Sequence, residues 1–184
     1  KVFIGTYDEG ILEIENFKLK NIYTHTNSSL GQLLGYKYVY VTGLAFDSKN
    51  NLWAANSGAG NMLSVKTTKD EWYSFNIGNS NLSHIMVDDN DYKWILNRDG
   101  YCIVYNDNNT ISNPDDDEYK ILTKASGQGG LPDFANCMAV DSKGTVWVGT
   151  NDGLATFYST HKIFQQGANY DASRILVPRN DGSG

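Results

Sequence analysis

The chain has 184 residues, of which 40% are hydrophobic and 12% aromatic, and this composition predicts a packed core rather than disorder. Its net charge is −6 and its basic residues are scattered, which excludes nucleic acid as a partner because phosphate binding needs clustered Lys and Arg. No apolar run approaches the about 18 residues of a membrane-spanning helix, so we expect no membrane insertion by this segment. The start at Lys1, without a signal region, favours a segment of a longer precursor.

One sequence pattern recurs along the chain, which is rich in Gly and Tyr and poor in Pro, as is typical of short strands joined by tight turns. The pattern is an apolar triplet, an Asp, a turn, a Trp six residues after the Asp, and a Gly six or seven residues after the Trp. Successive copies are 41 to 53 residues apart, which indicates a repeat architecture. Complete copies are "GLAFDSKNNLWAANSGAG" (43–60), "HIMVDDNDYKWILNRDG" (84–100) and "CMAVDSKGTVWVGTNDG" (137–153), with the pairs Asp47 and Trp53, Asp88 and Trp94, and Asp141 and Trp147.

The chain enters this repeat halfway, since "VFIGTYDEGI" (2–11) matches "VWVGTNDGL" with Phe3 in the Trp position. Each copy is expected to continue through a third and a fourth strand after the Trp strand. In chain order the expected third strands are 10–15, 62–67, 101–106 and 154–159, and the expected fourth strands are 17–24, 72–77, 119–123 and 162–166. The repeats divide a single domain into residues 1–40, a partial copy, and residues 41–80, 81–133 and 134–184.

Each copy is typical of an antiparallel meander. The apolar triplet suits a buried inner strand, and the Asp is expected to cap the following turn with its side-chain oxygens. Because the Asp and Trp recur in every complete copy, we interpret them as turn and packing positions rather than as parts of one ligand or catalytic site. The sequence therefore predicts an all-β fold, a β-propeller segment of about four four-stranded antiparallel blades. The tail "RILVPRNDGSG" has no triplet, Asp and turn to complete the first copy, so we expect an open arc of a larger propeller of six to eight blades.

The sequence predicts no catalytic residues, no metal site and no cofactor. The histidines have no Cys or Glu at metal-ligand spacing, and the cysteines lie in apolar runs that predict buried side chains, although a disulfide between them is left open. The acidic stretch 106–119 suggests calcium, but it lacks the spacing of a calcium-binding loop, and we interpret it as a solvated loop. The histidines are His25, His84 and His161, and the cysteines are Cys102 and Cys137.

The candidate ligand-binding residues lie in loops, where propellers carry their function. The run "LLGYKYVY" (33–40) places Tyr36, Lys37 and Tyr38 just before an inner strand, and Arg98 lies in the turn after a Trp strand. Aromatic and cationic side chains together could hold an anionic glycan. A Tyr-rich approach to a strand is equally typical of packing, so both interpretations stay open at this point.

The run "GLPDFANCMAVDSKGTVWVGTNDGLATF" resembles the two-component regulator propeller repeat, a blade motif of extracellular sensor domains in hybrid histidine kinases of Bacteroidetes. The segment "ATFYSTHKIF…SRILVPRNDG" resembles PorZ-like propeller proteins of the type IX secretion system. This second likeness implies a non-catalytic propeller in the periplasm or at the cell surface, with an anionic glycan, lipopolysaccharide, or other secretion or signalling proteins as partners. The chain departs from that group in extent, because it holds only about four repeats.

Two other functions fit the same repeats. One is the periplasmic sensor domain of a hybrid two-component histidine kinase, in which ligand binding would shift a two-state arrangement. The other is a propeller enzyme, a lyase or a glycan-cleaving protein, resembling the streptogramin lyases. An enzyme would need a His/Glu or paired-carboxylate cluster on one face, which three dispersed histidines do not suggest.

Overall fold

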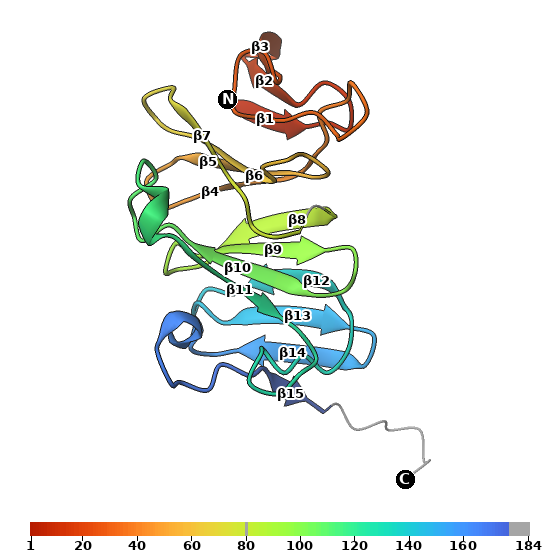
Figure 1. Cartoon of the computed structure of the whole chain (residues 1–184), viewed down its shortest axis with the longest axis vertical. Helices are drawn as coiled ribbons and strands as arrows, with labels where there is room; N and C mark the ends of the chain where they lie inside the picture. The colour runs from red at the N-terminus through yellow and green to blue at the C-terminus, as the bar shows by residue number, and fades with distance from the viewer. Residues whose placement is uncertain (80, 177–184) are drawn as a thin grey trace.

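The computed structural model describes residues 1–79 and 81–176, and these residues form four antiparallel sheets (Figure 1). The strands of each sheet are consecutive in the sequence, so every sheet is a meander. The first sheet lies at one end of the molecule and the last sheet at the other, with the remaining two stacked between them (Figure 1). The sheets therefore form an open arc of propeller blades, which confirms the predicted all-β fold and its open form.

The first sheet has three strands because the chain enters the repeat at the strand that carries Phe3. Its first strand, β1, corresponds to the Trp strand of the later sheets, and its pairing partner is β2 alone. The strands are β1 (Val2–Gly5), β2 (Ile11–Glu15) and β3 (Lys18–Tyr23).

The other three sheets have four strands each and share one register. The Trp of each repeat (Trp53, Trp94 or Trp147) lies in the second strand and pairs with the last-but-one residue of the first strand. The second sheet comprises β4 (Val41–Phe46), β5 (Leu52–Asn56), β6 (Leu63–Lys66) and β7 (Trp72–Phe75). The third comprises β8 (Leu82–Val87), β9 (Lys93–Asn97), β10 (Cys102–Asn106) and β11 (Glu118–Leu122). The fourth comprises β12 (Ala135–Val140), β13 (Val146–Thr150), β14 (Gly153–Phe157) and β15 (Ser173–Ile175).

Two short 3-10 helices interrupt the strands, η1 (Pro114–Asp116) and η2 (Thr160–Phe164). The second overturns one expectation, because residues 162–166 were predicted to form the fourth strand of the last sheet, and that strand is β15. The physical reason is the packing of two adjacent apolar residues. Ile163 is 1% exposed in the core between the third and fourth sheets, and the ring of Phe164 lies 5.0 Å from that of Tyr92. A strand would send these neighbours to opposite faces, whereas a helical turn lets both pack inward.

The repeated Asp and Trp form one hydrogen-bonded unit in each complete sheet. Asp88 Oδ1 accepts the backbone N–H groups of Asn90 and Tyr92, and its Oδ2 accepts the indole N–H of Trp94 at 3.0 Å. The same indole bond is 2.9 Å long from Trp53 to Asp47 and 3.0 Å long from Trp147 to Asp141. The Asp therefore caps the turn, as predicted, and also satisfies the one polar atom of a buried indole.

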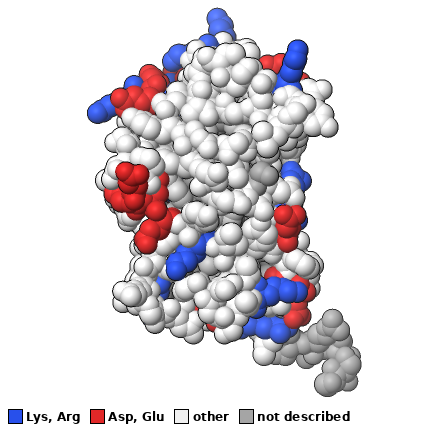
Figure 2. All heavy atoms as spheres, viewed as in Figure 1, with Lys and Arg blue, Asp and Glu red and all other residues white. Residues whose placement is uncertain are grey.

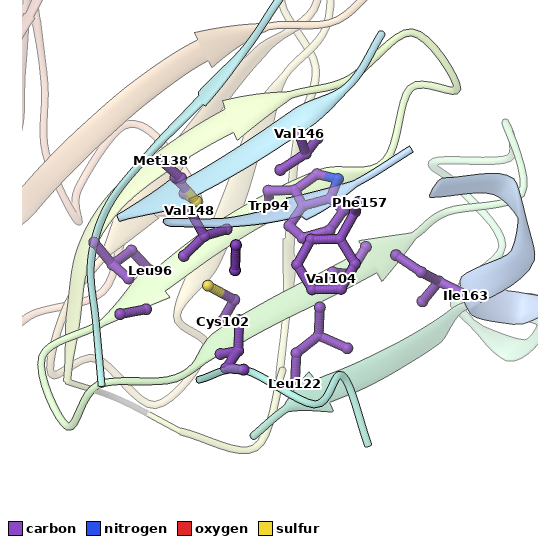
Figure 3. Packing of buried hydrophobic residues seen from close by; sticks show 13 residues of the cluster. Trp94, Leu96, Cys102, Val104, Leu122, Met138, Val146, Val148, Phe157 and Ile163 are labelled. Carbon is purple, nitrogen blue, oxygen red and sulfur yellow. The ribbon is translucent and has the colours of Figure 1, made fainter. Parts of the chain in front are cut away.

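The core consists of layers of side chains between successive sheets. Trp94 of β9 lies against Phe157 of β14, with 5.1 Å between the ring centroids, and Val104 and Leu122 lie close to the same pair (Figure 3). Trp53 and Trp94 are fully buried, whereas Trp147 is only half-buried, because the last sheet has a neighbouring sheet on one face only. Trp53 and Trp94 are thus packed between successive blades, as the repeat predicts.

The layer between the second and third sheets also holds a buried ion pair. Lys93 Nζ lies 2.6 Å from Asp107 Oδ1 and 4.2 Å from the ring centroid of Trp53. The side chains of Lys93 and Asp107 are 1% and 6% exposed, so both charges are removed from water. Such a pair holds its geometry because either charge alone would be costly to bury.

Both cysteines are free, and only one of them is buried. Cys102 in β10 is buried, as predicted. The prediction of a buried side chain is wrong for Cys137, which is exposed. Cys137 pairs with Gly149 in the last sheet, two residues along the strand from the pair of Ala139 and Trp147, so its thiol lies on the face of that sheet which also carries Trp147.

Candidate functional site: an aromatic row on the loop face

Four connections meet at one end of the strands and form what we call the loop face: residues 6–10, 24–40, 57–62 and 98–101. Backbone hydrogen bonds join the first three of these connections. The amide of Val39 donates to the carbonyl of Asp8 at 2.9 Å, and the amide of Leu34 donates to the carbonyl of Gly58 at 3.1 Å. Because antiparallel meanders place alternate turns at the same end, connections far apart in sequence become neighbours on this face.

Tyrosine rings form a continuous row on the loop face. The rings of Tyr36 and Tyr38 are stacked with centroids 6.2 Å apart, and those of Tyr38 and Tyr40 are stacked at 6.1 Å. Tyr7, from the β1–β2 turn, meets Tyr40 edge to face at 5.7 Å. Tyr36 and Tyr7 are 62% and 60% exposed, so a large part of the aromatic surface is open to solvent.

Arg98 lies at the Tyr7 end of this row. Its Nη2 donates to the hydroxyl oxygen of Tyr7 at 3.4 Å, and its Nε donates to the backbone carbonyl of Leu82 at 3.3 Å. A guanidinium has five N–H donors in a planar fork, so further donors remain for an anion. Beside Arg98 is a hollow of about 340 Å³ that is open to solvent and lined by Tyr7, Leu33, Tyr40, Thr42, Ser57, Gly58, Asn81 and Arg98.

The structure brings three of the four candidate residues into one arrangement. Tyr36 and Tyr38 are in direct contact, and Tyr40 and Tyr7 connect them to Arg98. Lys37 is exposed, and its backbone carbonyl accepts a hydrogen bond from Gln32 Nε2 at 3.1 Å. Whether these residues bind a ligand stays a prediction.

Sequence reasoning missed two members of the row. Tyr40 continues the spacing of two residues from Tyr36 and Tyr38, so the alternation itself was a signal that could have found it. Tyr7 had no such signal, because it joins the row through a contact with Arg98, which lies 91 residues away in the sequence.

The three histidines lie in different parts of the fold: His25 in the β3–β4 connection, His84 in β8 and His161 in η2. Within residues 1–79 and 81–176, no group of three or more His, Cys, Asp or Glu side chains is placed to hold a metal ion, the acidic stretch 106–119 included. No helix in this part of the chain is long and apolar enough to cross a membrane.

The fold and the loop face together define a class, an open β-propeller segment with an aromatic hollow at one end of its blades. Residues 129–152 match the family described as Two component regulator propeller. No curated protein sequence matches the chain. The predicted resemblance to this repeat family is therefore confirmed, over the segment that carries the last blade's first strands.

Solved structures extend the likeness to the whole chain. The chain is similar to PorZ, an essential surface component of the type IX secretion system of Porphyromonas gingivalis, with a TM-score of 0.79 over 94% of this chain at 23% identity. It is also similar to the extracellular domain of the hybrid two component system BT3049 of B. thetaiotaomicron, with a TM-score of 0.56 over 85% of the chain at 19% identity. The chain is similar as well to the extracellular domain of the one component system BT4673 of the same organism, with a TM-score of 0.57 over 95% of the chain at 14% identity. The chain spans 25%, 19% and 22% of the lengths of these three chains.

Proposed function

We propose that this chain is a non-catalytic binding region of a PorZ-like propeller that acts outside the cytoplasm, and that its aromatic row with Arg98 holds an anionic glycan such as the sugar portion of lipopolysaccharide. The observation that carries the proposal is the row of Tyr36, Tyr38, Tyr40 and Tyr7 ending at an arginine. Tyrosine rings offer flat apolar faces with polar edges, which suits the C–H faces and hydroxyl groups of sugars. A guanidinium binds phosphate or carboxylate oxygens through paired N–H groups.

The likeness to PorZ, a bacterial surface component, supports the cellular location. We expect no catalysis, because the described histidines lie apart and the repeated carboxylates are bonded to their own turns. Incubation with polysaccharide should release no reducing ends and no unsaturated product. Release of either would favour the propeller enzyme instead.

The test of glycan binding is a screen of the intact chain against lipopolysaccharide glycans with and without their phosphate groups. Binding of the phosphorylated glycans is expected to weaken at least tenfold in Tyr38→Ala and in Arg98→Gln. Tyr158→Ala is the matched control, because Tyr158 is also an exposed tyrosine, at 60% against 44% for Tyr38, and follows β14 at the opposite end of the strands. Equal binding by all three variants would refute the proposed site.

A second candidate function is the sensor domain of a two-component system. The similarity to the extracellular domain of the hybrid two component system BT3049 favours it, together with the repeat match. The discriminating observation is the reading frame that contains this chain. A membrane-spanning helix followed by kinase motifs would establish the sensor, whereas a second propeller followed by a β-sandwich would establish the PorZ-like protein.

A further inference from the structure

A second hollow, of about 320 Å³, lies along the outer strands of the second and third sheets, away from the aromatic row. Its residues come from the β5–β6 turn, from β7 and its end, from β10, and from the segment that contains η1 and the start of β11. It is therefore an interblade hollow, formed only because two sheets are stacked. The lining residues are Asn61, Ser74, Phe75, Asn76, Tyr105, Pro114, Asp117 and Tyr119.

The floor of this hollow is rigid. Tyr105 is 2% exposed, and its ring packs against Phe75 at 5.3 Å and against Trp53 at 6.0 Å. The Tyr105 hydroxyl donates to Asp117 Oδ2. One carboxylate oxygen is thus fixed by a residue that belongs to the core.

The other oxygen of the same carboxylate has no partner. Asp117 Oδ1 is enclosed and accepts no hydrogen bond from the described residues. Burial raises the pKa of Asp117, and the neighbouring carboxylates of Asp107 and Asp116 raise it further, while the bond from Tyr105 lowers it. A buried acceptor without a donor is uncommon in native proteins and costs free energy, which a hydrogen bond from a ligand hydroxyl in the hollow would recover.

The walls supply an aromatic plate and neutral polar groups. Tyr119 pairs with Tyr105 in the register of β10 and β11, so both rings lie on the same face of the third sheet, and Tyr119 is 45% exposed. Its ring lies over Gly78, where an added Cβ would stand 2.9 Å from the Tyr119 hydroxyl, so the glycine leaves room for the ring. Asn61 Nδ2 donates to Ser74 Oγ at 3.0 Å, and Asn76 Oδ1 accepts the Gly78 amide, which leaves the Asn76 Nδ2 group as a donor.

The charge around the hollow decides between ligand classes. The adjoining segment carries Asp115, Asp116 and Glu118 in addition to Asp117, and acidic side chains gather on the side of the molecule where η1 lies (Figures 1 and 2). This field disfavours an anionic ligand. Amide, hydroxyl and carboxyl groups beside an exposed aromatic ring are the chemistry that recognises an uncharged sugar, and the volume is large enough for one monosaccharide.

We propose that the interblade hollow is a binding site for a neutral monosaccharide, free or at the end of a glycan, with Tyr119 as the stacking plate and Asp117 as the hydroxyl acceptor. The site shares no residue with the aromatic row or with the hollow beside Arg98, which are proposed to take an anionic glycan. The two sites therefore differ in the charge of the ligand as well as in place.

The test is a titration of the intact chain with D-galactose, D-glucose, D-mannose and N-acetyl-D-glucosamine, followed by NMR and calorimetry. At least one is expected to bind, and binding is expected to weaken at least tenfold in Tyr119→Ala and in Asp117→Asn. Asp115→Asn, which removes an equal charge from the same segment, and Arg98→Gln on the loop face are expected to bind as the wild type does. Thermal unfolding of each variant checks that the fold is kept, and Tyr119→Phe, which keeps the ring, should restore binding.

A second titration distinguishes a free sugar from the end of a glycan. It uses the methyl glycoside of whichever sugar binds, because the methyl group mimics the linkage to the rest of a glycan. Retained binding of the glycoside indicates the end of a glycan, and binding of the free sugar alone indicates a free sugar. The proposal is overturned if none of the four sugars binds, or if the uronic acid of the same sugar binds as well. It is also overturned if Asp115→Asn weakens binding as much as Asp117→Asn, or if calcium chloride alone occupies the hollow.

Discussion

The most direct test of the repeat as a physical unit is Asp88→Ala. Asp88 is 5% exposed, and its carboxylate accepts two backbone amides of the β8–β9 turn and the indole N–H of Trp94. The substitution leaves a buried indole donor unpaired, at a cost of about 1–3 kcal/mol. It also removes the side-chain cap of the turn, which adds about 1 kcal/mol by analogy with helix caps. The free energy of unfolding is expected to fall by about 2–4 kcal/mol in total.

Urea denaturation followed by tryptophan fluorescence measures this loss, with circular dichroism as a second probe. Asp89→Ala is the matched control, because Asp89 is an adjacent, exposed carboxylate, and its effect should stay within about 0.5 kcal/mol. Trp94→Phe removes the indole donor, and the double variant Asp88→Ala with Trp94→Phe should show a coupling of about 1–2 kcal/mol. Asp141→Ala should cost less than Asp88→Ala, since Trp147 is half-buried and water can replace its partner. A loss within about 0.5 kcal/mol for Asp88→Ala would refute the reasoning.

Three further outcomes are expected. Lys93→Met leaves the buried carboxylate of Asp107 unpaired and should lower the free energy of unfolding by about 3–5 kcal/mol, whereas adding Asp107→Leu should recover much of that loss in the same urea experiment. Burial alone would raise the pKa of Glu13, but the hydrogen bonds that its carboxylate accepts lower it from 4.5 to about 2, so its stabilising contribution is present above the usual pKa and is lost as the pH falls from about 5 toward 2. Glu13→Gln should therefore flatten the acid limb of a plot of stability against pH, and an unchanged acid limb would contradict this. Ellman's reagent should label Cys137 in the folded protein and leave Cys102 unmodified until unfolding, because Cys102 is fully buried and burial raises the pKa of its thiol to about 12.

Most of the blades could be predicted from the sequence because their signals are local. An apolar triplet, a turn-capping Asp and a Trp strand lie within 18 residues of one another, and the alternation along each strand fixes which side chains point inward. The prediction failed at 162–166, where Ile163 follows the packing of its neighbouring sheet instead of the strand pattern. It also failed for Cys137, whose apolar surroundings in the sequence do not reveal that the last sheet is covered on one face only.

The candidate sites were less predictable, because they depend on which loops become neighbours. Tyr36 and Tyr38 could be selected as exposed aromatics near a strand, and Arg98 as a turn cation, but nothing local joined them. Their connection runs through Tyr7. The interblade hollow was even harder to predict from the sequence. The acidic stretch 106–119 was interpreted as a solvated loop, whereas the structure shows that Asp117 in this stretch accepts a hydrogen bond from the core residue Tyr105 and lines the hollow.

The sequence by itself determined the all-β fold, the repeating blade and its open arc, because each blade is a chain of neighbouring strands whose turns and hydrogen bonds are set within one repeat. Only the tertiary structure decided where the aromatic row ends, that a second hollow exists, and which thiol is exposed. These features arise from side chains that come from different blades, and the packing angle between blades, rather than any local pattern, brings such side chains within contact distance.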